Sequence, residues 1–384
     1  MWRSGFTGLG MLAVFSGALA CGSRALSEPA ASAGNGAEGS GGARSVGAGS
    51  AGTATMGVGP NSAGSSGAGS TAMTSSGAGA GQPGLVTLAS GQTCPWGMAI
   101  DATSVYWTTC GDPVGGSVMM VPKAGGEVVT LAAGDRLSGI AVDGASVYWV
   151  AGAADASTGA IMMLPIGGGT PMTLASRPGT PAHLAVDASY VYWTEQMQSA
   201  VVKVSLMGGA PTTVASGSPA WQIALGEEDV YWMGQGVMKA PKIGGPPVDL
   251  TPGLHMLPTA GLAVDGKNVY FTSGPPGGGT SGVSAVSSQG GTPTVVYADT
   301  SGVFTPPGPI AIDATRAYWA DGSNAVLCVP LSGGAATTLA TGQVNVVAIA
   351  VDETAVYWLV NGNADTGRGA VMKLPLAVLD TGCP

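Results

Sequence analysis

The sequence predicts an all-β fold for residues 85–384: a seven-bladed β-propeller closed by an N-terminal strand, with six or eight blades as alternatives. Three observations carry this prediction. A motif close to "IAVDxxxVYW" recurs seven times, its tyrosines lie 39 to 48 residues apart, and one extra strand-like stretch precedes the first motif. That spacing is the length of one four-stranded propeller blade.

Each repeat predicts four strands in a fixed order. Strand A is the apolar "IAV" stretch, strand B is "VYWT", strand C is a stretch such as "VMKLP" (371–375), and strand D is one such as "TTVAS" (212–216). The β-branched and aromatic residues of strand B suit a pleated, buried surface. The Gly-Gly pairs between strands C and D suit a hairpin that needs positive φ. We therefore expect each repeat to form one antiparallel sheet.

The two ends of the repeat region predict how the ring closes. The seventh strand C is followed only by "LAVLDTGCP", whereas "LVTLAS" (85–90) resembles a strand D and precedes the first strand A. We expect residues 85–90 to complete the seventh blade, because this pairing removes an open sheet edge.

The repeats resemble those of YWTD-type and NHL-like β-propellers across residues 85–384. Only Asp321 keeps the Asp that follows "YWT" in that family, and YWTD rings typically have six blades. The resemblance implies a propeller whose ligands bind on the face that carries the D-to-A and B-to-C loops, which we call the loop face.

The N-terminal segment resembles a bacterial lipoprotein signal. Residues 1–21 contain Arg3, a short apolar stretch and "GALA" before Cys21, which this resemblance implies is lipidated. Cleavage by signal peptidase I after Ala20 is the alternative. Residues 22–84 are rich in Gly, Ser and Ala and predict a disordered tether with a reach of about 45 Å. We expect an exported lipoprotein of the bacterial outer membrane or cell surface, or alternatively a secreted or periplasmic protein.

Several residues recur in every or nearly every repeat, and we interpret them as structural. The Ala of "IAVD" packs where the innermost strands crowd, and the Trp of "VYW" fills the space between sheets. The Asp begins the turn from strand A to strand B by accepting backbone N–H bonds. Blade four has Gly226 in its place, and nothing else in that repeat is expected to compensate.

Four cysteines follow Cys21, an even number that suggests disulfides in an exported protein. Antiparallel pairing of strands A and B in blade one places Cys94 opposite residue 110 or 111, which predicts a Cys94–Cys110 bridge. Cys328–Cys383 follows by elimination and would fix the C-terminal tail to blade six.

Candidate ligand-binding residues lie where the repeats disagree. The two positions before each "IAVD" are mostly small, but four are not: Trp96, His183, Trp221 and Gln222. Indole rings with a His and a Gln suit a neutral ligand such as a sugar. The structural alternative is that the two tryptophans plug the channel.

Composition limits the function. A net charge of −9 disfavours nucleic acid, and two histidines exclude a His-rich metal site. Asn361, Asn363 and Asp365 faintly resemble a calcium loop but lack a distal Glu. We expect no cofactor, a monomer, a membrane attachment through the lipid, and a protein or glycan partner. The leading hypothesis is a binding scaffold; the alternative is a metal-dependent hydrolase or lyase at the channel mouth.

Overall fold

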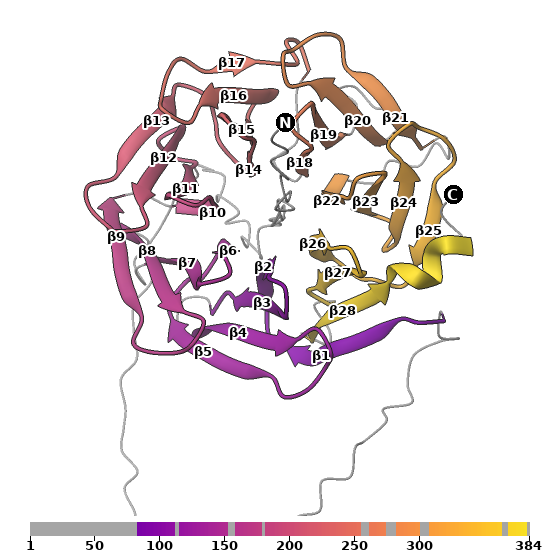
Figure 1. Cartoon of the computed structure of the whole chain (residues 1–384), viewed down its shortest axis with the longest axis horizontal. Helices are drawn as coiled ribbons and strands as arrows, with labels where there is room; N and C mark the ends of the chain where they lie inside the picture. The colour runs from indigo at the N-terminus through magenta and orange to yellow at the C-terminus, as the bar shows by residue number, and fades with distance from the viewer. Residues whose placement is uncertain are drawn as a thin grey trace, which may run out of the picture. The chain divides into compact units, whose positions relative to one another are not determined.

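The computed structural model describes residues 83–111, 115–152, 158–178, 181–254, 261–273, 282–299, 307–362 and 368–381. All of them belong to one compact unit. They form seven four-stranded antiparallel sheets that follow one another around a ring (Figure 1). The predicted seven-bladed β-propeller is confirmed, and the alternatives with six or eight blades are excluded.

The first four blades have their strands in the order A, B, C and D. Blade one consists of β2 (Pro95–Ile100), β3 (Ser104–Thr109), β4 (Gly116–Pro122) and β5 (Val129–Gly134). Blade two consists of β6 (Ile140–Val142), β7 (Ser146–Gly152), β8 (Thr158–Pro165) and β9 (Met172–Pro178). Blade three consists of β10 (Pro181–Val186), β11 (Tyr190–Glu195), β12 (Ala200–Ser205) and β13 (Thr212–Ser216). Blade four consists of β14 (Ile223–Leu225), β15 (Asp229–Met233), β16 (Val237–Pro241) and β17 (Val248–Asp249).

The remaining blades keep that order, with one exception at the seam. Blade five consists of β18 (Leu262–Val264), β19 (Asn268–Ser273), β20 (Gly282–Ser287) and β21 (Thr294–Ala298). Blade six consists of β22 (Pro307–Ile312), β23 (Arg316–Asp321), β24 (Val326–Pro330) and β25 (Thr337–Ala340). Blade seven consists of β26 (Val346–Val351), β27 (Ala355–Val360), β28 (Gly369–Pro375) and β1 (Val86–Gln92), and the 3₁₀ helix η1 (Leu376–Thr381) follows β28.

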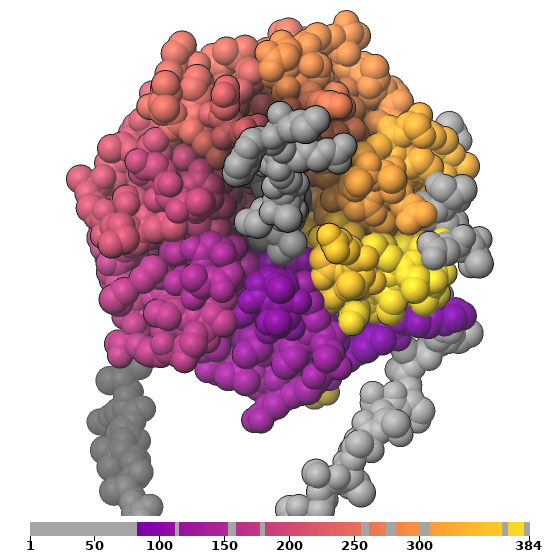
Figure 2. All heavy atoms as spheres, in the orientation of Figure 1, coloured from indigo at the N-terminus to yellow at the C-terminus, as the bar shows by residue number. Residues whose placement is uncertain are grey.

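Strand β1 closes the ring as the sequence predicts. It pairs antiparallel with β28, from Val86 opposite Lys373 to Gln92 opposite Gly369. The space-filling view shows the indigo strand lying along the yellow blade (Figure 2). Blade seven is therefore built from both ends of the repeat region, and its outer edge is covered by the strand that leads into blade one.

The core lies between the blades. Successive residues of strand B point to opposite faces of its sheet, so the tyrosine and tryptophan of one blade contact different neighbours. Trp193 packs with Tyr148 and Val150 of blade two, whereas Tyr192 packs with Trp232 of blade four. The aromatic repeat thus fills the spaces between sheets, as predicted.

The Gly-Gly turns between strands C and D have the expected backbone conformation. Gly125 and Gly126 have φ values of 85° and 138°, and Gly333 and Gly334 have 86° and 142°. Only glycine adopts both conformations without strain, so these pairs fix the length and direction of the C-to-D hairpins.

Candidate functional site

The two positions before "IAVD" form a β-bulge on the innermost strand in blades one, three and six, and Trp221 and Gln222 both bond to the backbone of Met233 in the same way in blade four. In blade one, Pro95 pairs with Thr109 and Met98 with Trp107, so Trp96 and Gly97 together oppose Thr108. In blade three, Ala182 and His183 oppose Thr194 in the same way. A bulge turns its two side chains toward the same face of the sheet. The candidate residues therefore point into the spaces between blades.

Small residues are needed at most bulges because neighbouring innermost strands are close together. A Cβ on Gly139 would overlap the carbonyl oxygen of Ala182, and a Cβ on Gly261 would lie 2.6 Å from the amide nitrogen of Ile310. His183 and Gln222 occupy the equivalent positions in blades three and four. Blades three and four therefore accommodate a large side chain at a position where blades two and five have room only for glycine.

In blades one, three and five, a threonine on strand B forms a hydrogen bond to the backbone of the next blade. Thr194 Oγ1 accepts a bond from the His183 amide (3.3 Å) and donates to the Trp221 carbonyl oxygen (2.8 Å). Thr108 and Thr272 make the equivalent contacts to Ser138 and Gly308, at 2.6 and 2.7 Å. This threonine follows "YW" in blades one and three and "YF" in blade five, and its role is to connect neighbouring blades.

His183 is held from one side and lacks a partner on the other. Its Nδ1 lies 3.0 Å from the Trp221 carbonyl oxygen, which can only accept, so Nδ1 carries the proton. Its side chain is buried, with 2% exposed. Burial lowers the pKa of His183 to about 4, although the bond to Trp221 opposes this effect. Nε2 is thus a buried lone-pair acceptor, and it has no hydrogen-bond partner among the described residues.

Blade four contributes two further buried polar atoms without partners in the described part of the chain: Gln222 Nε2 and Trp232 Nε1. Other indoles have an acceptor, since Trp107 donates to Gln92 and Trp358 donates to Gln343. The corresponding segment of blade four contains Ser218, whose hydroxyl contacts the carbonyl oxygen of Pro219 instead. Native structures leave few buried polar groups unpaired. The unpaired atoms of His183, Gln222 and Trp232 therefore make blades three and four the candidate binding region of the ring.

The four candidate residues do not all lie together. Trp96 is partly buried in blade one, whereas His183, Trp221 and Gln222 lie in blades three and four. Trp221 packs against the cluster that includes Met233 and Tyr270, and Gln222 belongs to the same bulge opposite Met233. The Trp221 side chain therefore faces blade five, whereas His183 faces blade four. A joint site that includes Trp96 stays a prediction.

Glu195 is an acidic residue of the loop face that the sequence interpretation missed. It is fully buried at the end of β11, and its Oε1 accepts a bond from Trp193 Nε1 at 3.1 Å. The available signal was its position: it follows "YWT", where the YWTD family has Asp. Asp321 at the same position of blade six accepts bonds from the backbone and hydroxyl of Ser323, so it shapes a turn.

The weak calcium-loop candidates stay untested. Asn361 is partly buried, and Asn363 and Asp365 lie outside the described residues. Within the described ranges, no three His, Cys, Asp or Glu side chains gather as a metal site would require. The signal peptide, Cys21 and the tether also lie outside the described residues. No helix in the described part is long and apolar enough to span a bilayer.

The predicted Cys94–Cys110 disulfide is present, with a Cα–Cα distance of 5.6 Å. The Cys110 amide also donates to the Cys94 carbonyl oxygen at 2.9 Å. The bridge closes the loop-face end of the β2–β3 hairpin, beside Trp96. Cys328 is also disulfide-bonded; Cys383 lies outside the described residues, so the pairing of these two stays a prediction.

The recurring Asp shapes the opposite face, which carries the A-to-B and C-to-D turns. Oδ1 of Asp101 accepts bonds from the Thr103 and Ser104 amides, both at 2.7 Å, and Oδ2 accepts the Tyr106 hydroxyl at 2.7 Å. The same set recurs at Asp143, Asp265 and Asp313. Burial, followed by the bond to Asp143, raises the pKa of Tyr148 to about 12. The turn role expected for this Asp is confirmed.

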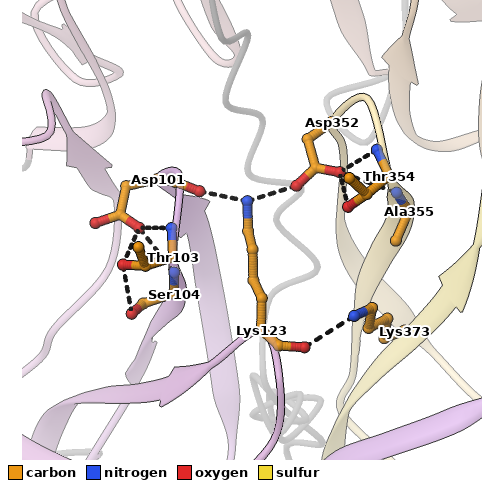
Figure 3. A network of polar contacts seen from close by, with 8 residues as sticks. All are labelled: Asp101, Thr103, Ser104, Lys123, Asp352, Thr354, Ala355 and Lys373. Atoms are coloured by element: carbon orange, nitrogen blue, oxygen red, sulfur yellow. Dashed lines mark hydrogen bonds and ion pairs between the residues drawn. The ribbon is translucent and has the colours of Figure 1, made fainter.

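Two aspartates at this position, Asp187 and Asp352, bind a lysine of the next blade. Lys242 Nζ of blade four lies 3.0 Å from Asp187 Oδ2, and Lys123 Nζ of blade one lies 2.5 Å from Asp352 Oδ2 (Figure 3). Lys123 Nζ also donates to the Asp101 carbonyl oxygen, and Lys373 Nζ donates to the Lys123 carbonyl oxygen at 2.9 Å. We call Lys123, Asp101, Asp352 and Lys373 the seam network, because it joins the last blade to the first.

The expectation that nothing replaces the missing Asp in blade four was wrong. A Cβ on Gly226 would lie 2.8 Å from the Tyr231 ring. Asp229, at the start of β15, lies close enough to raise the pKa of Tyr231, after the larger effect of burial. Asp229 also binds Lys239 at 3.0 Å. In blade four the carboxylate that interacts with Tyr231 is therefore Asp229, three residues after the position that Asp occupies in the other blades.

The ring of seven four-stranded sheets is a β-propeller. Comparison with known proteins shows similarity in this fold. No protein-family model and no curated protein matches the chain. An oligogalacturonate lyase in complex with manganese is 9% identical with a TM-score of 0.54, covering 72% of this chain and 88% of that one. YCF48 bound to D1 peptide is 14% identical with a TM-score of 0.50, covering 76% and 94%. The computationally designed Ika8 protein is 12% identical with a TM-score of 0.50, covering 74% and 98%.

At these identities the similarity shows the fold alone. Propellers of this architecture include an enzyme, a peptide-bound protein and a designed ring. The fold therefore fits binding scaffolds and enzymes alike, and the function has to be argued from the residues of this chain.

Proposed function

We propose that this chain is an exported binding protein, held at a bacterial envelope by lipidated Cys21 and the tether of residues 22–84, whose propeller binds its partner on the loop face at blades three and four. The observation that carries the proposal is the gathering of unpaired buried polar atoms there: His183 Nε2, Gln222 Nε2 and Trp232 Nε1. Burying such groups without partners costs free energy, so a site of this kind is retained where a bound molecule supplies the missing bonds.

The two sides of the ring differ in what they offer a partner. On the face with the A-to-B turns, the recurring carboxylates are already bonded to backbone amides, tyrosines or lysines. On the loop face, the half-buried Trp221 lies beside Gln222, and an aromatic surface next to an unpaired amide nitrogen suits a peptide or a glycan. YCF48, a ring of the same fold, is bound to a peptide, which supports a binding role by analogy only.

The test is partner capture with the full chain in a bacterial envelope. Cross-linking followed by purification should recover a partner with the wild-type chain, and Trp221→Ala combined with Gln222→Ala should reduce recovery by about tenfold or more. Met207→Ser is the matched control, because Met207 is 93% exposed on a C-to-D turn of the opposite face. Equal recovery from the double variant and the wild type would contradict the proposed site.

The same cells test the anchor. The wild-type chain should fractionate with membranes and incorporate labelled palmitate, whereas Cys21→Ser should do neither and should appear in the soluble envelope fraction. A wild-type chain without label would contradict the lipid anchor and favour the secreted alternative.

A further inference from the structure

The space between blades three and four contains a buried donor and a buried acceptor that face it from opposite sides. These blades are neighbours in the ring, with β10 beside β14 (Figure 1). His183 projects from blade three and reaches the Trp221 carbonyl oxygen of blade four. Trp232 projects from blade four and packs with Tyr192 and Val201 of blade three.

The indole N–H groups of the ring are directed toward the loop face. Trp107 donates to Gln92, which precedes its own strand A, and Trp193 donates to Glu195 at the loop-face end of β11. Trp232 occupies the equivalent position on β15, opposite Ile223. By this repeat equivalence its N–H points toward the same end of the inter-blade space as the bulge residue His183.

The two unpaired atoms are chemically complementary. Trp232 Nε1 can only donate, and His183 Nε2 can only accept because Nδ1 carries the proton. They do not bond to each other. A hydroxyl group satisfies both, since its oxygen accepts from the indole and its hydrogen is donated to the imidazole. A carboxylate or an ammonium group would satisfy only one of the two.

We infer that the space between blades three and four binds a hydroxyl group of an uncharged sugar or polyol, bridging Trp232 Nε1 and His183 Nε2. This inference rests on the proposed binding function and specifies the ligand class of the same region. Both side chains are almost fully covered, with 1% and 2% exposed. Because both groups are covered in this way, we expect only a narrow part of a ligand, such as the hydroxymethyl arm of a hexose, to reach them.

The nearby charges agree with a neutral ligand. Glu195, the acid at the loop-face end of β11, has its side chain on the blade-two side of that strand, with Trp193. Lys203 and Lys242 lie at the other end of the inter-blade space, where Lys203 donates to the Lys242 carbonyl oxygen and Lys242 binds Asp187. Because burial lowers the pKa of His183 to about 4, its ring is uncharged at neutral pH.

The test uses the full mature chain and four named compounds: D-glucose and D-galactose, which carry a hydroxymethyl arm, D-xylose, which lacks it, and D-galacturonate, which has a carboxylate there. The hexoses should bind and shift the Trp232 Nε1–H resonance, whereas D-xylose and D-galacturonate should bind at least about tenfold more weakly. If no hexose binds, or if all four bind equally, the inference is overturned.

Trp232→Phe removes the donor and keeps an aromatic ring, and should weaken hexose binding by about tenfold. Trp107→Phe is the matched control, because that indole already donates to Gln92, and it should bind as the wild type does. Equal binding by Trp232→Phe overturns the inference. Should that variant not fold, His183→Asn, which keeps an amide toward Trp221 but removes the Nε2 acceptor, replaces it with the same expected loss.

The outcomes separate this inference from the proposed function. If Trp232 Nε1–H shows contact only with water and no hexose binds, the space holds a trapped water and the inference fails. Partner capture that still depends on Trp221 and Gln222 would then uphold the proposed function. Hexose binding without captured partners would support the inference and contradict a protein partner.

Discussion

One carboxylate position makes two kinds of contact in this ring. The Asp that ends strand A accepts backbone amides with Oδ1, whereas Oδ2 accepts the tyrosine hydroxyl in four blades and binds a lysine of the next blade at Asp187 and Asp352. The turn contact involves residues two and three positions away, so it could be predicted from the sequence. The choice of partner for Oδ2 could not, because it depends on residues 55 and 229 positions away at Lys242 and Lys123.

His183 should make the stability of the ring depend on pH between about 4 and 6.5. Its folded pKa is about 4, below the ordinary 6.5, so the unfolded chain binds a proton that the folded chain excludes. This contribution is present above pH 6.5 and is lost as the pH falls toward 4. We expect the wild type to lose on the order of 1–2 kcal/mol of unfolding free energy from this residue between pH 7 and 5.

The measurement is urea unfolding at pH 7 and 5. His183→Asn should be less stable at pH 7 and should lose less stability on acidification than the wild type does. The chain offers a matched control, because its other histidine, His255, can be changed to Asn in the same way. An identical loss in the wild type and His183→Asn would show that His183 is not excluded from protonation in the folded state.

At the scale of the element, the A–B hairpin with its bulge was predictable in part. The strands, the turn and the Cys94–Cys110 bridge follow from alternation and antiparallel spacing, which are local properties. The bulge at Trp96 and Gly97 was not predicted, because an extra residue opposite Thr108 leaves the apolar pattern unchanged. The orientation of Trp221 toward blade five, and of His183 toward blade four, depends on the equivalent bulges of blades four and three.

The disulfide should stabilise the first hairpin by an amount that follows from the length of the loop it closes. Cys94 and Cys110 are 16 residues apart, and a closed loop of that length contributes about 3 kcal/mol in the chain-entropy model. Changing both cysteines to Ser should lower the free energy of unfolding by about that amount and accelerate amide exchange in β2 and β3. Exchange in blade five is the internal control and should stay unchanged. Uniform acceleration throughout the ring would contradict a local role.

At the scale of the whole molecule, closure of the ring was predicted by counting strands: a strand D in front of the first strand A has one place to pair. The seam network was not predictable in this way. Lys123 and Asp352 become neighbours only after blade seven is placed beside blade one. The same arrangement joins blades three and four through Lys242 and Asp187, so the ring is held by an ion pair at the seam and by another away from it.

Lys123→Met tests whether the seam network holds the ring closed. Lys123 and Asp352 have side chains only 10% and 13% exposed, so removing the lysine leaves a mostly buried carboxylate unpaired and should cost about 2 kcal/mol at pH 7. Burial alone would raise the pKa of Asp352, but bonds from Lys123 and Thr354 lower it below 3.8. The stabilisation is therefore present above that value and is lost as the pH falls, so variant and wild type should converge in strong acid.

Amide exchange distinguishes closure of the ring from a local effect of the ion pair. Lys123→Met should accelerate exchange on both sides of the seam, in β1 and β28 as well as in β2 and β3, because either blade loses its neighbour when the seam opens. Lys239→Met is the matched control: it removes a 3.0 Å pair with Asp229 that is similarly buried but lies within blade four. That variant should accelerate exchange in blade four only. If Lys123→Met leaves β1 and β28 as protected as in the wild type, pairing of β1 with β28 holds the ring closed without the lysine.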